Sequence, residues 1–171
     1  MSRSVLRLRP LRSDDEAEFL AGHRTMLATD GWSFALGLDE SVSWNDYIAR
    51  LSDIRRGINL PAGIVPAAFL VAEVDGRIVG RTSIRFELND WLARQGGHIG
   101  YGVLPDHRRL GHATEILRQS LVIARSEGVE RSLLCCDDTN TASATVIERC
   151  GGQLESVVDG DGGPVRRYWL R

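Results

Sequence analysis

The chain has 171 residues, of which 43% are hydrophobic and 26% are charged, and its formal net charge is -2. These are the proportions of an ordinary soluble globular protein, and the length predicts a single domain over residues 1–171. The small net charge argues against a nucleic-acid-binding surface. All 21 basic residues are arginine, which excludes chemistry based on a lysine nucleophile.

The cysteines and the first residues bear on the compartment. Cys135, Cys136 and Cys150 lack the spacing of a zinc site or a disulfide framework, so we expect reduced thiols and no metal site. The N-terminal residues contain no apolar stretch of signal-peptide type, and no window of the chain reaches membrane-spanning length. We therefore expect a cytoplasmic protein that does not associate with a membrane.

The first half of the chain predicts a strand, two helices and a hairpin. Apolar and charged residues alternate over residues 5–9, and an acidic cap begins a helix over about residues 13–27. A second helix is expected over about residues 43–56, after an irregular segment whose tryptophan and phenylalanine side chains favour core packing. Residues 67–74 and 77–88 form a hairpin, because a DG turn dipeptide joins two runs of strand character.

The second half predicts two strand–helix pairs and a closing hairpin. Residues 98–104 read as a strand, and a helical apolar stripe starts after Gly111. A strand over residues 131–136 precedes a short helix that ends at a pair of glycines. Residues 154–158 and 165–170 form the last hairpin around the turn DGDGG. The predicted order is β-α-α-β-β-β-α-β-α-β-β, a mixed α+β domain.

The segment "HRRLGHATEIL" (107–117) places cations and a glycine where a helix begins. Unpaired backbone N–H groups and the helix dipole stabilise an anion there, and Gly111 lets the backbone approach it closely. Arg108 and Arg109 add positive charge, so the segment predicts a diphosphate site. A Walker loop is excluded by the lack of lysine, and a dinucleotide fingerprint by Pro105 in place of its third glycine.

Two stretches in the same order resemble the GNAT superfamily of acetyl-CoA-dependent N-acetyltransferases. They are "IGYGVLPDHRRLGHATEILRQSL" and "CDDTNTASATVIERCGG". The chain is most similar to a bacterial subgroup of uncharacterised members that share "GGHIGYGV" and an "RRYW"-like last strand. The resemblance implies the GNAT fold: a mostly antiparallel twisted sheet of about six or seven strands, splayed between the fourth and fifth, with about four helices.

The same resemblance implies which residues bind coenzyme A. It assigns to the co-substrate Tyr101, Gly102, Val103, Arg108, Arg109, Leu110, Gly111, His112, Ala113, Thr114, Asn140 and Ser143. The strand residues pair with the pantetheine arm beside a bulge, and a backbone N–H near Val103 faces the developing oxyanion. Asn140 lies by the pantetheine and Ser143 by the thiol, although Asn140 is equally well explained as a helix N-cap.

The catalytic groups are less well defined by the pattern. Many relatives donate a proton to the departing thiolate from a tyrosine seven positions after Asn140, but this chain has Ile147 there. Tyr101, Tyr168 or a water would then have to replace that tyrosine. Glu87 and His98 are the first candidates for the base that deprotonates the amine, and a structural role for His98 is an equal alternative.

We therefore expect acetyl transfer from acetyl-CoA to a primary amine by direct attack in a ternary complex, by a monomer or homodimer. The alternative is a GNAT module that binds acyl-CoA as a sensor or interaction partner without turnover. The sequence leaves the acceptor open among small amines, peptide N-termini and protein lysines.

Overall fold

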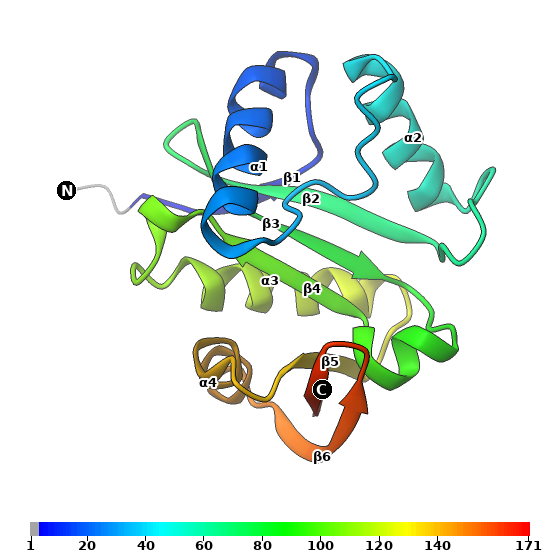
Figure 1. Ribbon diagram of the computed structural model, residues 1–171, viewed down its shortest axis with the longest axis vertical. Helices are drawn as coiled ribbons and strands as arrows, with labels where there is room; N and C mark the ends of the chain where they lie inside the picture. Colours follow the sequence, from blue (N-terminus) through cyan, green and yellow to red (C-terminus); the bar gives the residue numbers. More distant parts are fainter. Residues whose placement is uncertain (1–3) are drawn as a thin grey trace.

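A computed structural model describes residues 4–171, and its elements follow the predicted order (Figure 1). The elements are β1 (Arg7–Arg9), α1 (Glu16–Asp30), α2 (Trp44–Arg56), β2 (Ala67–Val74), β3 (Arg77–Arg85), β4 (Ile99–Val103), α3 (His112–Ser126), β5 (Ser132–Asp137), α4 (Thr141–Arg149), β6 (Gln153–Gly160) and β7 (Gly163–Leu170). The predicted mixed α+β architecture is thus confirmed.

The helix boundaries follow from local chemistry at their ends. Ser43 caps α2 by accepting a hydrogen bond from the Asp46 N–H, and Gly57 ends the helix with a φ of 71°. A single 3-10 turn, Ser13–Asp15, precedes α1, which ends at Gly31 with a φ of 64°. The first helix therefore extends three residues beyond the predicted end, to the first residue that favours a left-handed conformation.

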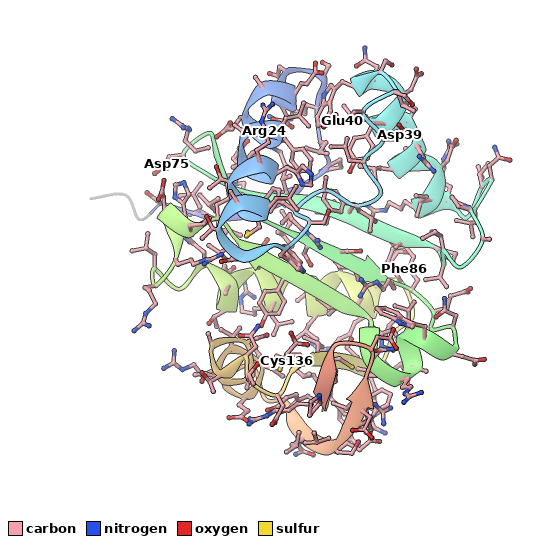
Figure 2. All side chains as sticks on the ribbon, in the orientation of Figure 1. Arg24, Asp39, Glu40, Asp75, Phe86 and Cys136 are labelled. Carbon is pink, nitrogen blue, oxygen red and sulfur yellow. The ribbon has the colours of Figure 1, made fainter. Side chains whose placement is uncertain are left out.

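Two layers of helices cover the strands. In Figure 1, α1 and α2 lie on one side of the sheet, and α3 and α4 lie on the other. One core cluster joins α3 and α4 to the strands through residues such as Leu117, Ile147 and Cys136. The Cys136 side chain lies beside α4 (Figure 2). A second cluster, which includes Phe19 and Tyr47, fills the space under α1 and α2.

The strands form two hydrogen-bonded sheets, one with the order β1-β2-β3-β4 and one with the order β5-β7-β6. They meet where β4 and β5 begin: Gly97 and Leu134 form an isolated bridge, and the His98 N–H donates to the Leu133 carbonyl at 2.7 Å. The His98 ring strengthens this junction, because its Nδ1 accepts the Leu133 N–H at 2.9 Å. Beyond the junction β4 and β5 separate, as the sequence predicted.

The prediction of a bulge in β4 is wrong. The register between β3 and β4 runs without a shift from Gly80 opposite Val103 to Ile84 opposite Ile99. Shifts occur instead between β2 and β3, at Ala72/Glu73, and between β6 and β7. β4 therefore separates from β5 without an extra residue in β4. Within residues 4–171, the only bridge between the two strands lies at their start.

Candidate active site

The start of α3 presents a row of free backbone N–H groups. Within residues 4–171, no acceptor is found for the six successive amides from Arg109 to Thr114, and no side chain caps the helix. Arg109 has a φ of 64° and Gly111 a φ of 82°, so left-handed residues curve this backbone as in an anion-binding nest. We call the segment Arg109–Thr114 the amide cradle. Its geometry suits an oxyanion with several acceptor atoms, such as a diphosphate.

The two cradle arginines differ in what they contact. The guanidinium of Arg108 is tied inward: its Nε donates to the Val103 carbonyl at 3.1 Å, and it forms an ion pair with Asp30 at the end of α1. Arg109 is exposed. The sequence assigned the Arg108 guanidinium to the anion. In the structure this guanidinium joins α1 to β4, so the candidate anion site consists mostly of backbone N–H groups.

The remaining cradle side chains leave the backbone accessible. Leu110 is exposed, and a Cβ placed on Gly111 would meet no atom within 4 Å. His112 is partly buried, and this burial lowers its pKa, so its ring is neutral near pH 7. A pocket of about 380 Å³ borders the cradle at His107, Leu110 and His112 and reaches the turn between β2 and β3.

The hydrogen-bond alternation of β4 sets which of its backbone groups are free. The Arg85 N–H donates to the His98 carbonyl and the Leu104 N–H to the Val79 carbonyl. In an antiparallel ladder of this register, Gly100 and Gly102 bond to β3, while the backbone of Tyr101 and Val103 is directed toward β5. Tyr101 and the N–H of Val103 can therefore pair with an added extended ligand. The Gly102 backbone is already used by β3, and the Val103 carbonyl already accepts the Arg108 Nε.

Tyr101 reaches from β4 to the start of α4. Its hydroxyl lies 3.0 Å from the Ser143 Oγ, so two residues that the sequence assigned to the co-substrate are brought together. Burial raises the pKa of Tyr101 to about 12, and the phenol therefore keeps its proton at neutral pH. Asn140 caps α4, because its Oδ1 accepts the Ser143 N–H at 3.1 Å.

The other tyrosine candidate for the proton donor is occupied by a structural contact. Ile147, at the position used by many relatives for a tyrosine, is fully buried in the core. Tyr168 is also buried, and its hydroxyl donates to the Glu148 Oε1 at 2.9 Å. Tyr101 is therefore the tyrosine placed where β4 and β5 separate.

The two base candidates lie in different surroundings. His98 is buried, burial lowers its pKa, and its Nδ1 already accepts the Leu133 N–H. The structure thus favours the structural alternative for His98, since its remaining nitrogen must carry the proton. Glu87 is exposed beyond the end of β3, and no hydrogen bond holds its carboxylate within residues 4–171.

Arg81 is a buried residue that sequence reasoning missed. Its Nε donates to the Phe34 carbonyl at 2.9 Å and its Nη2 to the Ser33 carbonyl at 3.0 Å, which ties the α1–α2 loop to β3. Its guanidinium lies 4.1 Å from the centre of the Trp32 ring. Burial lowers the pKa of Arg81 to about 9. An arginine among polar residues in a strand gives no sequence signal for such burial.

Replacing Arg81 with methionine is expected to lower the free energy of unfolding by about 3 kcal/mol, because the buried Phe34 carbonyl and the part-buried Ser33 and Gly100 carbonyls lose a charged donor. Urea unfolding measures this. Arg77→Met on the same strand is the control: its side chain is 74% exposed and pairs only with Glu18, so a loss under about 0.5 kcal/mol is expected. Equal losses in the two variants would contradict the tethering role.

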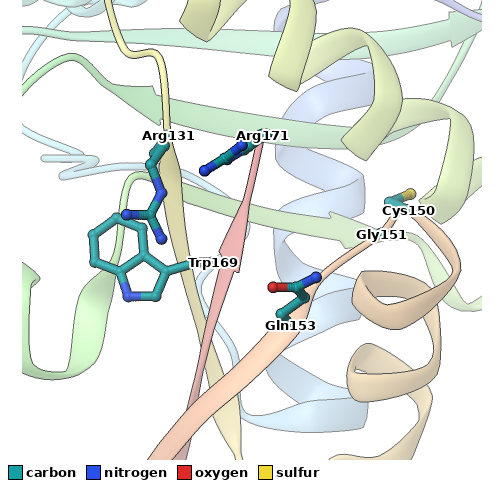
Figure 3. Close-up of a pocket in the computed structure, with 6 residues that line it drawn as sticks. All are labelled: Arg131, Cys150, Gly151, Gln153, Trp169 and Arg171. Atoms are coloured by element: carbon teal, nitrogen blue, oxygen red, sulfur yellow. The ribbon is translucent and has the colours of Figure 1, made fainter.

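A second pocket, of about 410 Å³, lies between the start of β5 and the residues that follow α4. Figure 3 shows Arg131 beside the Trp169 ring, with Arg171 nearby and Cys150, Gly151 and Gln153 across the opening. Arg131 lies 5.0 Å from the Trp169 ring centre. None of the residues assigned to the co-substrate lines this pocket.

Across residues 4–171, no three His, Cys, Asp or Glu side chains come close enough together to hold a metal ion. In the same part of the chain, no helix has the length and apolar character needed to cross a membrane.

The fold is shared with solved acetyltransferase structures. Mycobacterium smegmatis RimJ in complex with CoA-disulfide is 22% identical, with a TM-score of 0.72 over 96% of this chain and 81% of that one. An N-acetyltransferase from Staphylococcus aureus Mu50 is 16% identical, with a TM-score of 0.66 over 99% and 98% of the chains. The microcin C7 self-immunity acetyltransferase MccE, in complex with acetyl-CoA and AMP, is 17% identical, with a TM-score of 0.66 over 96% and 91%. No curated protein sequence gives a significant match.

The sheet that opens between β4 and β5 beside the start of α3 thus has the architecture of an acyltransferase. The sequence profile of the Acetyltransferase (GNAT) family matches residues 33–152, and the chain belongs to this family. It is therefore an enzyme of acetyl transfer, and the resemblance noted in its sequence is confirmed.

Proposed function

We propose that the protein transfers an acetyl group from acetyl-CoA to a primary amine by direct attack within a ternary complex. The amide cradle is the observation that carries this proposal, because its six free N–H groups fit the diphosphate of coenzyme A. RimJ and MccE are described with coenzyme A derivatives, which supports acetyl-CoA as the donor. The Staphylococcus aureus relative is named an N-acetyltransferase, which supports an amine acceptor.

In this proposal the pantetheine arm runs from the cradle into the space where β4 and β5 separate. The free backbone groups of Tyr101 and the free N–H of Val103 pair with the arm, as an added strand would. An N–H of this strand stabilises the oxyanion that forms when the amine attacks the thioester carbonyl. The Tyr101 phenol, with Ser143 beside it, then donates a proton to the departing thiolate. Collapse of the intermediate releases the acetylated amine and coenzyme A.

Thiol release tests the proposed function. Acetyl-CoA is incubated with the protein and a library of amines, and free thiol is measured against acetyl-CoA alone. We expect thiol release that depends on both the protein and an amine, with the N-acetylated product identified by mass. Tight acetyl-CoA binding without turnover across the library would instead indicate a non-catalytic acyl-CoA-binding module.

Glu87 is proposed as the base that accepts the amine proton, since its carboxylate is exposed and unpaired within the described chain. Glu87→Gln is expected to lower kcat/KM about 100-fold at pH 7, because general base catalysis has this magnitude. The pH profile of kcat/KM separates this role from a structural one. Asp90→Asn, at another exposed carboxylate nearby, is the control, and equal activity in the two variants would remove Glu87 from the mechanism.

A further inference from the structure

The two faces of β4 differ in what covers them. Ile99, Tyr101 and Val103 pack with α3 and α4. On the opposite face the strand has only Gly100 and Gly102, and a Cβ on Gly102 would lie 2.5 Å from the Trp32 ring, which covers that position. Gly100 is partly exposed. An acceptor that approaches β4 from this side therefore reaches it at Gly100.

The Arg85 guanidinium lies beside Gly100. A Cβ on Gly100 would lie 3.5 Å from both Nη1 and Nη2 of Arg85, so the guanidinium and the missing side chain share one face of the sheet. Nη1 is held by the carbonyls of Gly96 and Gly97 at 3.3 and 3.2 Å. Within residues 4–171, Nη2 donates to no acceptor, and it is not among the buried polar atoms that lack a partner. Nη2 therefore has no protein partner among the described residues and keeps some solvent-accessible surface.

The positive charge of Arg85 is not balanced by its surroundings. No carboxylate of the described residues pairs with it, and burial lowers its pKa. Burial raises the pKa of the Cys135 thiol on β5 to about 11, and the charges of Arg167 and Arg85 oppose this shift. Arg167 pairs with Glu155 at 2.6 Å, yet its Nε is buried without a partner.

Arg81 lies on the same face of β3 as Arg85. Its guanidinium adds a further cation, which donates hydrogen bonds only to carbonyls. The wall around Gly100 therefore has two guanidinium groups, from Arg85 and from Arg81, whose Nη1 donates to the Gly100 carbonyl at 3.4 Å. Neither group forms an ion pair with a carboxylate of the described residues. Such a wall repels a polycationic acceptor and attracts one that carries an anion.

We infer that the acceptor is an amine that carries its own carboxylate or similar oxyanion a few bonds from the nitrogen, and that Arg85 binds this anion. The inference rests on the proposed function and specifies its acceptor. The planar guanidinium suits a carboxylate, and the free Nη2 supplies the donor. The surrounding positive charge also favours the neutral form of the amine, which is the form that attacks.

Paired acceptors test the inference. The kcat/KM values of amino acids are compared with those of the corresponding amino acid amides, which keep the amine and lose the anion. Aminomethylphosphonate is compared with glycine to separate a phosphonate from a carboxylate. We expect the wild-type protein to prefer acids over amides by at least about 10-fold, a change typical of one lost charged hydrogen bond.

Arg85→Gln is expected to bring the ratio of acid to amide close to one while the KM for acetyl-CoA stays unchanged. Arg94→Gln is the matched control, because Arg94 is an exposed arginine in the connection between β3 and β4 and donates only to the Asp159 carbonyl. It should keep the wild-type ratio. If thermal unfolding shows that Arg85→Gln is not folded, Arg85→Lys replaces it and should lower the ratio while keeping the charge.

An amide preference in the wild-type protein, or a ratio unaffected by both Arg85 variants, would overturn the inference and leave the proposed function standing. If no amine is turned over although acetyl-CoA binds, the proposed function fails instead. Calorimetric binding of amino acids and their amides to the protein saturated with coenzyme A then tests the anion site alone. Equal affinities there would overturn it, and a preference for acids that Arg85→Gln removes would support it.

Discussion

Replacing Gly111 with leucine is expected to weaken acetyl-CoA binding by about 100-fold or more. The φ of 82° and the empty space around the Cα let the backbone of the amide cradle lie directly against an anion. A leucine side chain would fill that space and keep the diphosphate from at least two N–H donors. Hydrogen bonds to a charged group contribute about 1.5–3 kcal/mol each. Isothermal titration calorimetry measures the affinity.

Gly128→Leu is the matched control for this experiment. Gly128 follows the other end of α3, has a φ of 89°, and also has no atom within 4 Å of an added Cβ. Both substitutions therefore impose a similar backbone cost of about 1–2 kcal/mol, but only one touches the cradle. Similar affinities for the two variants would show that the start of α3 does not bind the diphosphate.

Replacing Tyr101 with phenylalanine is expected to lower kcat about 100-fold with little change in the KM for acetyl-CoA. The phenol is the donor placed near the separation of β4 and β5, and general acid catalysis has this magnitude. Because burial raises the Tyr101 pKa to about 12, the donor stays protonated, and kcat should show no loss from its ionisation up to about pH 10. Steady-state kinetics from pH 6 to about pH 10 measure both effects.

Tyr168→Phe separates the catalytic role from a structural one. Both hydroxyls are hydrogen-bonded to α4, Tyr101 at Ser143 and Tyr168 at Glu148. The two variants should lose comparable stability, about 1 kcal/mol, but only Tyr101→Phe should lose turnover. An active Tyr101→Phe enzyme would assign the proton transfer to water.

The order of the elements could be predicted because each has a local signal. The helical stripe after Gly111, the cap at Ser43 and the DG turn act over a few residues, and the structure places α3, α2 and the β2–β3 hairpin accordingly. The family signature could be recognised for the same reason, since the cradle is one continuous segment. Its function lies in backbone groups, which follow from local conformation.

Features that depend on contacts between distant residues could not be predicted. The ion pair of Arg108 with Asp30 joins residues that are far apart in the sequence, so the sequence pattern gives no sign of this contact. The burial of Arg81 and the position of Arg85 over Gly100 depend on the α1–α2 loop and on the register of β3 with β4. The bulge in β4 was expected from relatives and is absent here, since register depends on the pairing of two strands.

The amide cradle is proposed to bind the diphosphate of coenzyme A. The most direct test is a titration of ¹⁵N-labelled protein with coenzyme A, followed by backbone amide resonances. The largest shifts should fall on Arg109–Thr114, because these free N–H groups acquire acceptors, with smaller shifts at Tyr101 and Val103. Saturable binding whose shifts leave Arg109–Thr114 unchanged would contradict the account.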